Sequence, residues 1–203
     1  LWRCTSCEFI FAADDDVERL TELYAELDDP AYEEGEESRA LQMQQLVKHI
    51  LAIHPAAGSL LDVGAAAGLL VNEAAALGLD AVGIEPSRSL ASFARERGSA
   101  VHQGVLPHPA LEGKQFDIVS VIDVIEHVSD PLALLREASA YLAPGGVLAV
   151  VTPDVGSVAA RLLGQRWWHF RLAHVCYFNK RSAAEVFERA GLRVRSERRA
   201  GWF

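Results

Sequence analysis

A run of small residues between two apolar segments is the feature of this sequence best suited to binding a ligand. Residues 60–68 read LLDVGAAAG, so an apolar stretch ends at Gly64 and only alanine precedes Gly68. Small side chains let a backbone approach a ligand closely, and a helix that begins after such a turn offers free N–H groups. Glu85 lies 21 positions after Gly64. A carboxylate at that spacing is placed to hold both hydroxyls of a ribose.

Two classes of nucleotide-containing cofactor use this layout. A dinucleotide-binding turn has the pattern G-x-G-x-x-G, but Ala66 and Leu69 stand at its second and third glycine positions. Asp62 would also repel a pyrophosphate, whereas a carboxylate attracts a cofactor with an amino group and a positively charged sulfonium. The residues therefore favour S-adenosylmethionine, and an NAD-dependent oxidoreductase is kept as the alternative.

Alternating helices and strands must position these residues. Apolar runs predict strands at 59–63, 81–84, around 101, at 116–122, 147–152 and 192–198. Helical spacing predicts helices at 16–27, 38–53, 68–77, 87–97, 130–142 and 182–190. The central strands are apolar on both faces, which is typical of a mostly parallel sheet covered by helices on both faces. We therefore expect a doubly wound α/β fold, with ligands at the carboxyl ends of the strands.

Six ordered motifs resemble those of the class I S-adenosylmethionine-dependent methyltransferases. They occupy residues 61–68, 82–87, 116–119, 123–131, 142–148 and 152–154. The resemblance extends over about residues 38–198 and is strongest to the branch that contains ubiquinone-type O-methyltransferases and many small-molecule methyltransferases. It implies a Rossmann-like methyltransferase fold, S-adenosylmethionine as cofactor and S-adenosylhomocysteine as product.

The resemblance implies cofactor contacts for residues that follow the predicted strands. These are Asp62, Gly64, Ala65, Ala66 and Gly68 on the methionine side, Glu85 at the ribose with Pro86 beside the adenine, Gln103, Gly104 and Val105 along the adenine, and Asp123 and Val124 near the sulfonium. Tyr32, with Tyr24, would belong to an N-terminal helical cap that closes over the cofactor. The family usually has glycine where Ala66 stands, and an acidic residue where Gly104 and Val105 stand.

The acceptor side is expected just past the fourth strand of the sheet. Histidine titrates near neutral pH, so His127 is the expected general base, oriented by Glu126. The alternative is that His127 only packs beneath the following helix. His174 belongs to a block typical of this branch and is the third expected catalytic residue. Asp123, Glu126, His127 and His174 also resemble the set in metal-binding methyltransferases that act on vicinal hydroxyls.

Aromatic residues gather between positions 167 and 178. Trp167 and Trp168, with Tyr177, are expected to wall a flat acceptor. The alternative is that one tryptophan fills the edge of the core while the other lies on the surface. Cys176 is expected to be a small buried apolar residue rather than a nucleophile.

Composition limits the remaining classes. The 203 residues carry a net charge of −9, and half of them are hydrophobic. That composition is globular, and its acidity argues against a dedicated nucleic-acid binder. No apolar run reaches the length of a membrane span. Three cysteines favour a reducing cytoplasm, and Cys4 with Cys7 would supply half of a four-ligand zinc site.

The expectation is a cytoplasmic enzyme that methylates a small molecule, with an oxygen acceptor favoured. Residues 1–37 would form a Cys-x-x-Cys leader and an acidic helical cap, and residues 38–203 a methyltransferase domain cut short at its C-terminus. A non-catalytic module that binds the cofactor is the second alternative, because fold does not fix function. The substrate and the oligomeric state stay open.

Overall fold

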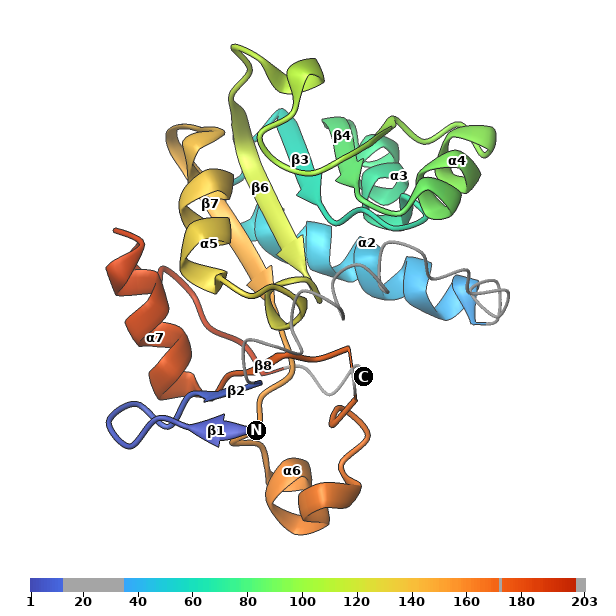
Figure 1. Ribbon diagram of the computed structural model, residues 1–203. Helices are drawn as coiled ribbons and strands as arrows, with labels where there is room; N and C mark the ends of the chain where they lie inside the picture. The colour runs from blue at the N-terminus through green and yellow to red at the C-terminus, as the bar shows by residue number, and fades with distance from the viewer. Residues whose placement is uncertain (13–34, 172, 200–203) are drawn as a thin grey trace. The chain divides into compact units, whose positions relative to one another are not determined.

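The computed structural model describes residues 1–12, 35–171 and 173–199 (Figure 1). The chain divides into two compact units, each built from several chain segments. The sheet unit comprises residues 25–121, 137–149 and 196–203. The hairpin unit comprises residues 1–24, 122–136 and 150–195.

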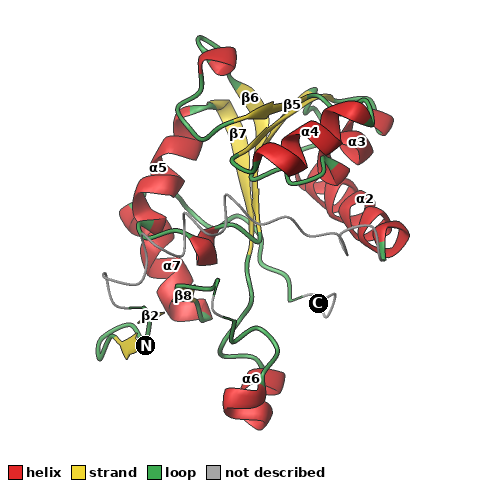
Figure 2. Cartoon of the chain, turned by 45° about the vertical axis from the view of Figure 1, so that its right-hand side comes forward, coloured by secondary structure: helices red, strands yellow, loops and turns green. Residues whose placement is uncertain are grey.

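A five-stranded sheet confirms the doubly wound α/β prediction, and its strands are drawn in yellow in Figure 2. The strand order is β5-β4-β3-β6-β7. Their bounds are β3 Ser59–Val63, β4 Asp80–Glu85, β5 Val101–Gln103, β6 Phe116–Ile122 and β7 Leu142–Val151. β3 pairs in parallel with both β4 and β6, and β4 pairs in parallel with β5. The chain order reverses between β3 and β6, which is the switch point where such sheets bind ligands.

Helices precede and follow the strands at the positions that the sequence pattern predicts. They are α2 Glu36–Ile53, α3 Leu69–Ala76, α4 Arg88–Glu96 and α5 Pro131–Ala140. Ser87 caps α4 as expected, because its side chain accepts a hydrogen bond from the backbone N–H of Leu90. The core of the sheet unit consists of fully buried aliphatic side chains, including Leu60, Leu61, Ile84, Leu111 and Ile118.

The hairpin unit has its own small antiparallel sheet. Its strands are β1 Trp2–Arg3, β2 Ile10–Phe11 and β8 Cys176–Tyr177, in the order β1-β2-β8. Two helices flank β8 in the sequence, α6 Val158–Leu163 and α7 Lys180–Arg189. A capping box at Asn179 and Ser182 begins α7. A small apolar core joins Ala160, Trp167 and Tyr177.

Some sequence predictions differ from the structure. The predicted strand at 192–198 is wrong, because residues 192–199 have no regular secondary structure. A strand needs a neighbour to pair its backbone groups, and neither described sheet includes these residues. The strand predicted at 147–152 begins earlier, at Leu142, and passes through Gly145 at φ +83°.

Other expectations are not tested by the described residues. The helix predicted at 16–27, and with it the helical cap and Tyr32, lies outside them. The division at residue 37 stays a prediction. Within the described part of the chain, no helix has the length and apolar character that crossing a membrane requires.

Candidate cofactor and acceptor sites

Asp62 lies near the end of β3, beside the switch point of the sheet. Its neighbour across the β3–β6 pair is Ser120, whose hydroxyl donates a hydrogen bond of 2.7 Å to Asp62 Oδ1. The Asp62 side chain is almost completely buried. Burial, partly offset by the Ser120 hydrogen bond, raises the pKa of Asp62 to about 7. A positive group beside this carboxylate would favour its ionised form.

Glu85 holds the small-residue turn that follows β3. Its Oε2 accepts a hydrogen bond from the backbone N–H of Ala66 at 2.8 Å, and its Oε1 accepts one from Ser87 at 2.7 Å. The side chain is 2% exposed. The turn has positive φ angles at Gly64, Ala66 and Gly68. The structure thus brings the turn and the acidic residue together, and the ribose contact of Glu85 stays a prediction.

Most backbone N–H groups of this turn already donate within the protein. Those of Gly64 and Ala65 donate to the carbonyl of Ile84, and that of Gly68 donates to Ala65. That of Ala66 donates to Glu85. A pyrophosphate site needs such groups for the phosphate oxygens. The turn therefore does not suit a dinucleotide, and the NAD-dependent alternative is disfavoured.

The end of β5 carries the residues that are predicted to line the adenine. Gln103 pairs with Glu85 in the parallel register, and the backbone N–H of Gly104 donates to the Glu85 carbonyl. The side chain of Val105 is 64% exposed. His108, which sequence reasoning missed, contacts the Gln103 carbonyl through Nε2 at 3.1 Å. A Cβ on Gly104 would lie 2.7 Å from this ring, so glycine is required there.

The chemistry of this donor set fits S-adenosylmethionine. Asp62 offers a buried carboxylate to a cation, and Glu85 offers carboxylate lone pairs to ribose hydroxyls. Both residues lie near the carboxyl ends of neighbouring parallel strands, because Asp62 precedes the last residue of β3 and Glu85 is the last residue of β4.

Asp123 and Val124 directly follow β6 and belong to the hairpin unit. Asp123 adopts a left-handed conformation with φ +52°, and its backbone N–H donates to the Val151 carbonyl at 2.9 Å. Burial raises the pKa of Asp123 to about 6. A non-glycine residue with positive φ is uncommon and often marks a functional position.

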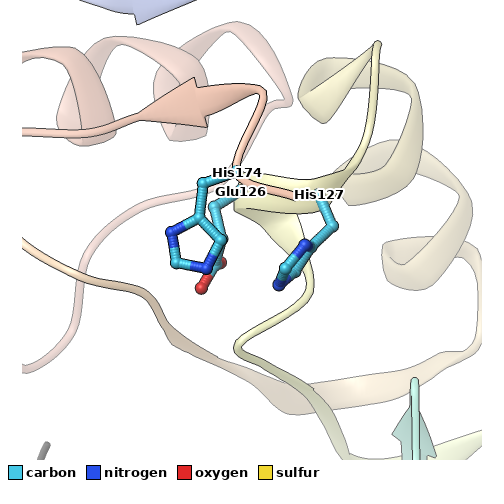
Figure 3. Close-up of side chains that lie close together, drawn as sticks. All are labelled: Glu126, His127 and His174. Atoms are coloured by element: carbon cyan, nitrogen blue, oxygen red, sulfur yellow. The ribbon is translucent and has the colours of Figure 1, made fainter. Parts of the chain in front are cut away.

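Glu126, His127 and His174 lie close together in the hairpin unit (Figure 3). We call them the Glu–His–His cluster. One ligand atom from each residue lies within 4.8 Å of the others. The two histidine rings meet edge to face, with centroids 4.7 Å apart. The backbone holds the arrangement, because the N–H of Val175 donates to the Glu126 carbonyl at 2.9 Å.

The hydrogen bonds of the cluster define its proton positions. His127 Nδ1 lies 2.8 Å from the Ala173 carbonyl. A carbonyl only accepts, so Nδ1 carries the proton and Nε2 of the neutral ring is the basic nitrogen. Thr152 donates to Glu126 Oε2 at 2.9 Å. Glu126 Oε1 and His174 Nδ1 are buried and have no hydrogen-bond partner among the described residues.

Burial sets the charge state of the cluster. It raises the pKa of Glu126 to about 8, with a further contribution from the charge of Asp123. Burial also lowers the pKa of His127, and it lowers that of His174 to about 4 with help from the neighbouring histidines. The cluster is therefore neutral near pH 7, and each neutral imidazole keeps one nitrogen lone pair that can accept a hydrogen bond or bind a ligand.

The aromatic residues divide as the structural alternative predicted. Trp167 and Tyr177 are buried in the small core, and the Tyr177 hydroxyl donates to the Arg171 carbonyl. Trp168 is 47% exposed. A substrate-wall role for these three residues stays a prediction. Cys176 is buried, and burial raises the pKa of its thiol to about 12, as expected for an unreactive residue.

Cys4 and Cys7 lie in the connection between β1 and β2. Cys4 Sγ lies 3.1 Å from Ser6 Oγ, and this contact leads the effects that lower the pKa of Cys4 to about 7. In the described ranges, neither cysteine joins a group of three possible metal ligands. The half zinc site stays a prediction.

Sequence reasoning missed the contacts of Ser120, Thr152 and Ala173, which orient the predicted residues. Ser120 had one sequence signal, since it is the polar residue in the middle of the apolar run VSVI of β6. Thr152 and Ala173 are ordinary residues whose roles arise from contacts between distant chain segments. Thr152 lies in the 152–154 motif, but that motif gave no sign of its contact with Glu126.

Comparison with known proteins establishes the family. A family model described as "Methyltransferase domain" matches residues 36–197. The chain belongs to this family. A ubiquinone biosynthesis O-methyltransferase of Azorhizobium caulinodans is 34% identical over 116 residues, which are 53% of this chain and 46% of that relative. Another from Xanthomonas axonopodis is 36% identical over 49% of this chain and 45% of its own length. The matched region thus spans about half of these curated relatives.

Solved structures agree with the family. A protein of Thermotoga maritima, titled a SAM-dependent methyltransferase and possible histamine N-methyltransferase, has a TM-score of 0.61 at 25% identity and covers 87% of this chain and 79% of its own. A SAM-bound amino pentose methyltransferase of Micromonospora echinaspora has a TM-score of 0.53 at 27% identity. The match covers 63% of this chain and 58% of that protein. The chain is a class I S-adenosylmethionine-dependent methyltransferase domain, and S-adenosylmethionine is its cofactor.

Proposed function

We propose that the protein transfers the cofactor's methyl group to an oxygen of a small molecule, with the acceptor hydroxyl bound at the Glu–His–His cluster. The observation that carries the proposal is the pair of buried polar atoms, Glu126 Oε1 and His174 Nδ1, without a partner among the described residues. Buried polar atoms are normally hydrogen-bonded, and a catalytic role or a bound ion is one explanation for those that are not. The O-methyltransferase relatives support an oxygen acceptor.

The cofactor-binding role rests on the sheet unit. Asp62 would attract the positively charged end of the cofactor, and Glu85 would accept hydrogen bonds from its ribose hydroxyls. S-adenosylmethionine supplies an electrophilic methyl group when bound. The protein's share of such a displacement is mainly orientation and exclusion of water.

His127 would act as the general base. Its ring is neutral near pH 7, and the Ala173 carbonyl fixes the proton on Nδ1. With the cofactor supplying the methyl group, Nε2 of His127 would accept the proton that the acceptor hydroxyl loses. A positioned base typically contributes about 10²–10⁴-fold to the rate.

A divalent cation in the same cluster is the second candidate. The observation that favours it is the close spacing of three ligand atoms, all within 4.8 Å of one another. Glu126 and His174 would bind such an ion through their unpartnered atoms, and it would supply Lewis acidity to a bound hydroxyl.

The test is methyl transfer from labelled S-adenosylmethionine to catechol, a small vicinal diol. His127→Asn keeps a donor for the Ala173 carbonyl and removes the basic nitrogen, so we expect a fall in kcat of about 100-fold or more. His49→Asn on α2 is the matched control. Equal rates in His127→Asn and His49→Asn would refute the role of His127 as general base. Activity abolished by a chelator and restored by Mg²⁺, Mn²⁺ or Zn²⁺ would favour the cation over the base alone.

Two broader expectations remain proposals. A small-molecule acceptor, rather than a nucleic acid, is proposed because the chain carries a net charge of −9. Placement in the cytoplasm is proposed from its cysteine content.

A further inference from the structure

Helix α6 and the turn after it expose an unusual amount of apolar surface. Leu162 is 81% exposed, Val158 72%, Trp168 47% and Leu163 40%. Val158 and Leu162 are four positions apart and therefore share a face of α6. Single exposed apolar residues are common, but a group of large ones marks an interaction surface. We call these four residues the α6 patch.

The α6 patch is held by the small core on its other side. Ala160 and Trp167 are buried with Tyr177, so the helix and the residue before Trp168 are fixed from within. Arg171 Nε donates to the Trp168 carbonyl at 3.0 Å and braces the following turn. The exposure of the α6 patch is thus a product of ordered packing in the hairpin unit.

The chain segment that carries the α6 patch is basic. Residues 155–184 contain five Lys and Arg residues and no Asp or Glu, although the whole chain carries a net charge of −9. Arg161, Arg166 and Arg171 are exposed and alternate with the apolar residues of the α6 patch. Arginines beside exposed leucine and tryptophan are typical of segments that lie in the interface of an anionic bilayer.

We propose that the α6 patch docks the protein on an anionic lipid surface. Apolar side chains would enter the headgroup region while the arginines contact lipid phosphates. A protein partner would more often present apolar contacts with mixed charges, whereas this surface complements a uniformly negative one. The inference goes beyond methyl transfer and does not depend on the acceptor.

A row of rings joins the α6 patch to the Glu–His–His cluster. Ring centroids are 5.8 Å apart between Trp168 and His169, 6.1 Å between His169 and His174, and 4.7 Å between His174 and His127. Docking would therefore bring the lipid surface close to the proposed acceptor site, within the same unit.

The test is cosedimentation of the full chain with vesicles, without cofactor or acceptor. We expect binding to vesicles of phosphatidylcholine mixed with phosphatidylglycerol, little binding to phosphatidylcholine alone, and weaker binding at high salt. Leu162→Asp should weaken binding at least about tenfold, because a charge replaces an inserted apolar side chain. Leu41→Asp, at a 55% exposed leucine on α2, is the matched control and should bind as the unaltered protein does.

Failure of anionic vesicles to bind the protein, or equal binding by Leu162→Asp and Leu41→Asp, would overturn the proposal. The protein could instead form a concentration-dependent dimer and bind no vesicles. If Leu162→Asp disrupts that dimer, the α6 patch joins two copies of the chain. Methyl transfer to catechol in aqueous solution separates the two proposals. Leu162→Asp should retain it even where lipid binding is lost.

Discussion

Ser120 donates a 2.7 Å hydrogen bond to Asp62 across the β3–β6 pair, at the point where the sheet reverses its strand order. This bond holds a buried carboxylate at the end of β3. It also opposes the effect of burial, which raises the pKa of Asp62 to about 7. The charge that Asp62 offers to a cofactor thus depends on a hydroxyl from the neighbouring strand.

Ser120→Ala should weaken cofactor binding. Without the hydroxyl, the ionised form of Asp62 loses a hydrogen bond to a charged group, which is typically worth about 1.5–3 kcal/mol. We expect the Kd for S-adenosylhomocysteine, measured by titration calorimetry, to rise by about tenfold or more. Ser92→Ala on α4 is the control. A Kd that is the same in both variants would contradict this role for Ser120.

Asp62→Asn should change the pH dependence of stability. Folding raises the pKa of Asp62 from 3.8 to about 7. The stability that this raised pKa contributes is therefore fully present below about pH 4 and is lost as the pH rises through about 7. Asparagine does not titrate, so the variant should gain stability relative to the unaltered protein over that range. Asp80→Asn, at an exposed position in β4, is the control.

Urea unfolding without cofactor at a series of pH values measures this difference. An Asp62→Asn curve parallel to that of the unaltered protein from about pH 4 to pH 8 would show that folding does not raise this pKa.

Ala66→Gly should not destabilise the turn. Ala66 has φ +45°, a left-handed conformation that costs an L-residue about 1–2 kcal/mol. Glycine adopts it freely, and this gain offsets its greater loss of chain entropy. Ala65→Gly, at the neighbouring buried alanine, is the control and should lose stability. An equal loss of unfolding free energy in both variants would refute strain at Ala66.

The parts of the fold that the sequence predicts best are those with local signals. The apolar runs of β3 and β6 have the predicted bounds, and Ser87 caps α4 as its position indicates. The alternation of strands and helices also predicts which site residues lie at the ends of strands. The contacts of Ser120 and Thr152 could not be predicted, because strand register and tertiary structure bring these residues to Asp62 and Glu126.

The strand predicted at 192–198 failed for a related reason. Val194 and its neighbours have an alternation that suits a strand, but a strand also needs a paired neighbour, and this segment has none in the two described sheets. The composition of a segment does not provide that neighbour.

Cofactor affinity in Glu85→Ala is the most direct test of the account, because Glu85 joins the turn, the strand end and the proposed ribose contact. Ser87→Ala removes the cap of α4 and should cost about 1 kcal/mol of stability while it leaves binding intact. Titration calorimetry with S-adenosylmethionine on both variants, under conditions where both are folded, should give a Kd raised about 100-fold or more for Glu85→Ala alone. An unchanged Kd in folded Glu85→Ala would contradict the assigned cofactor site.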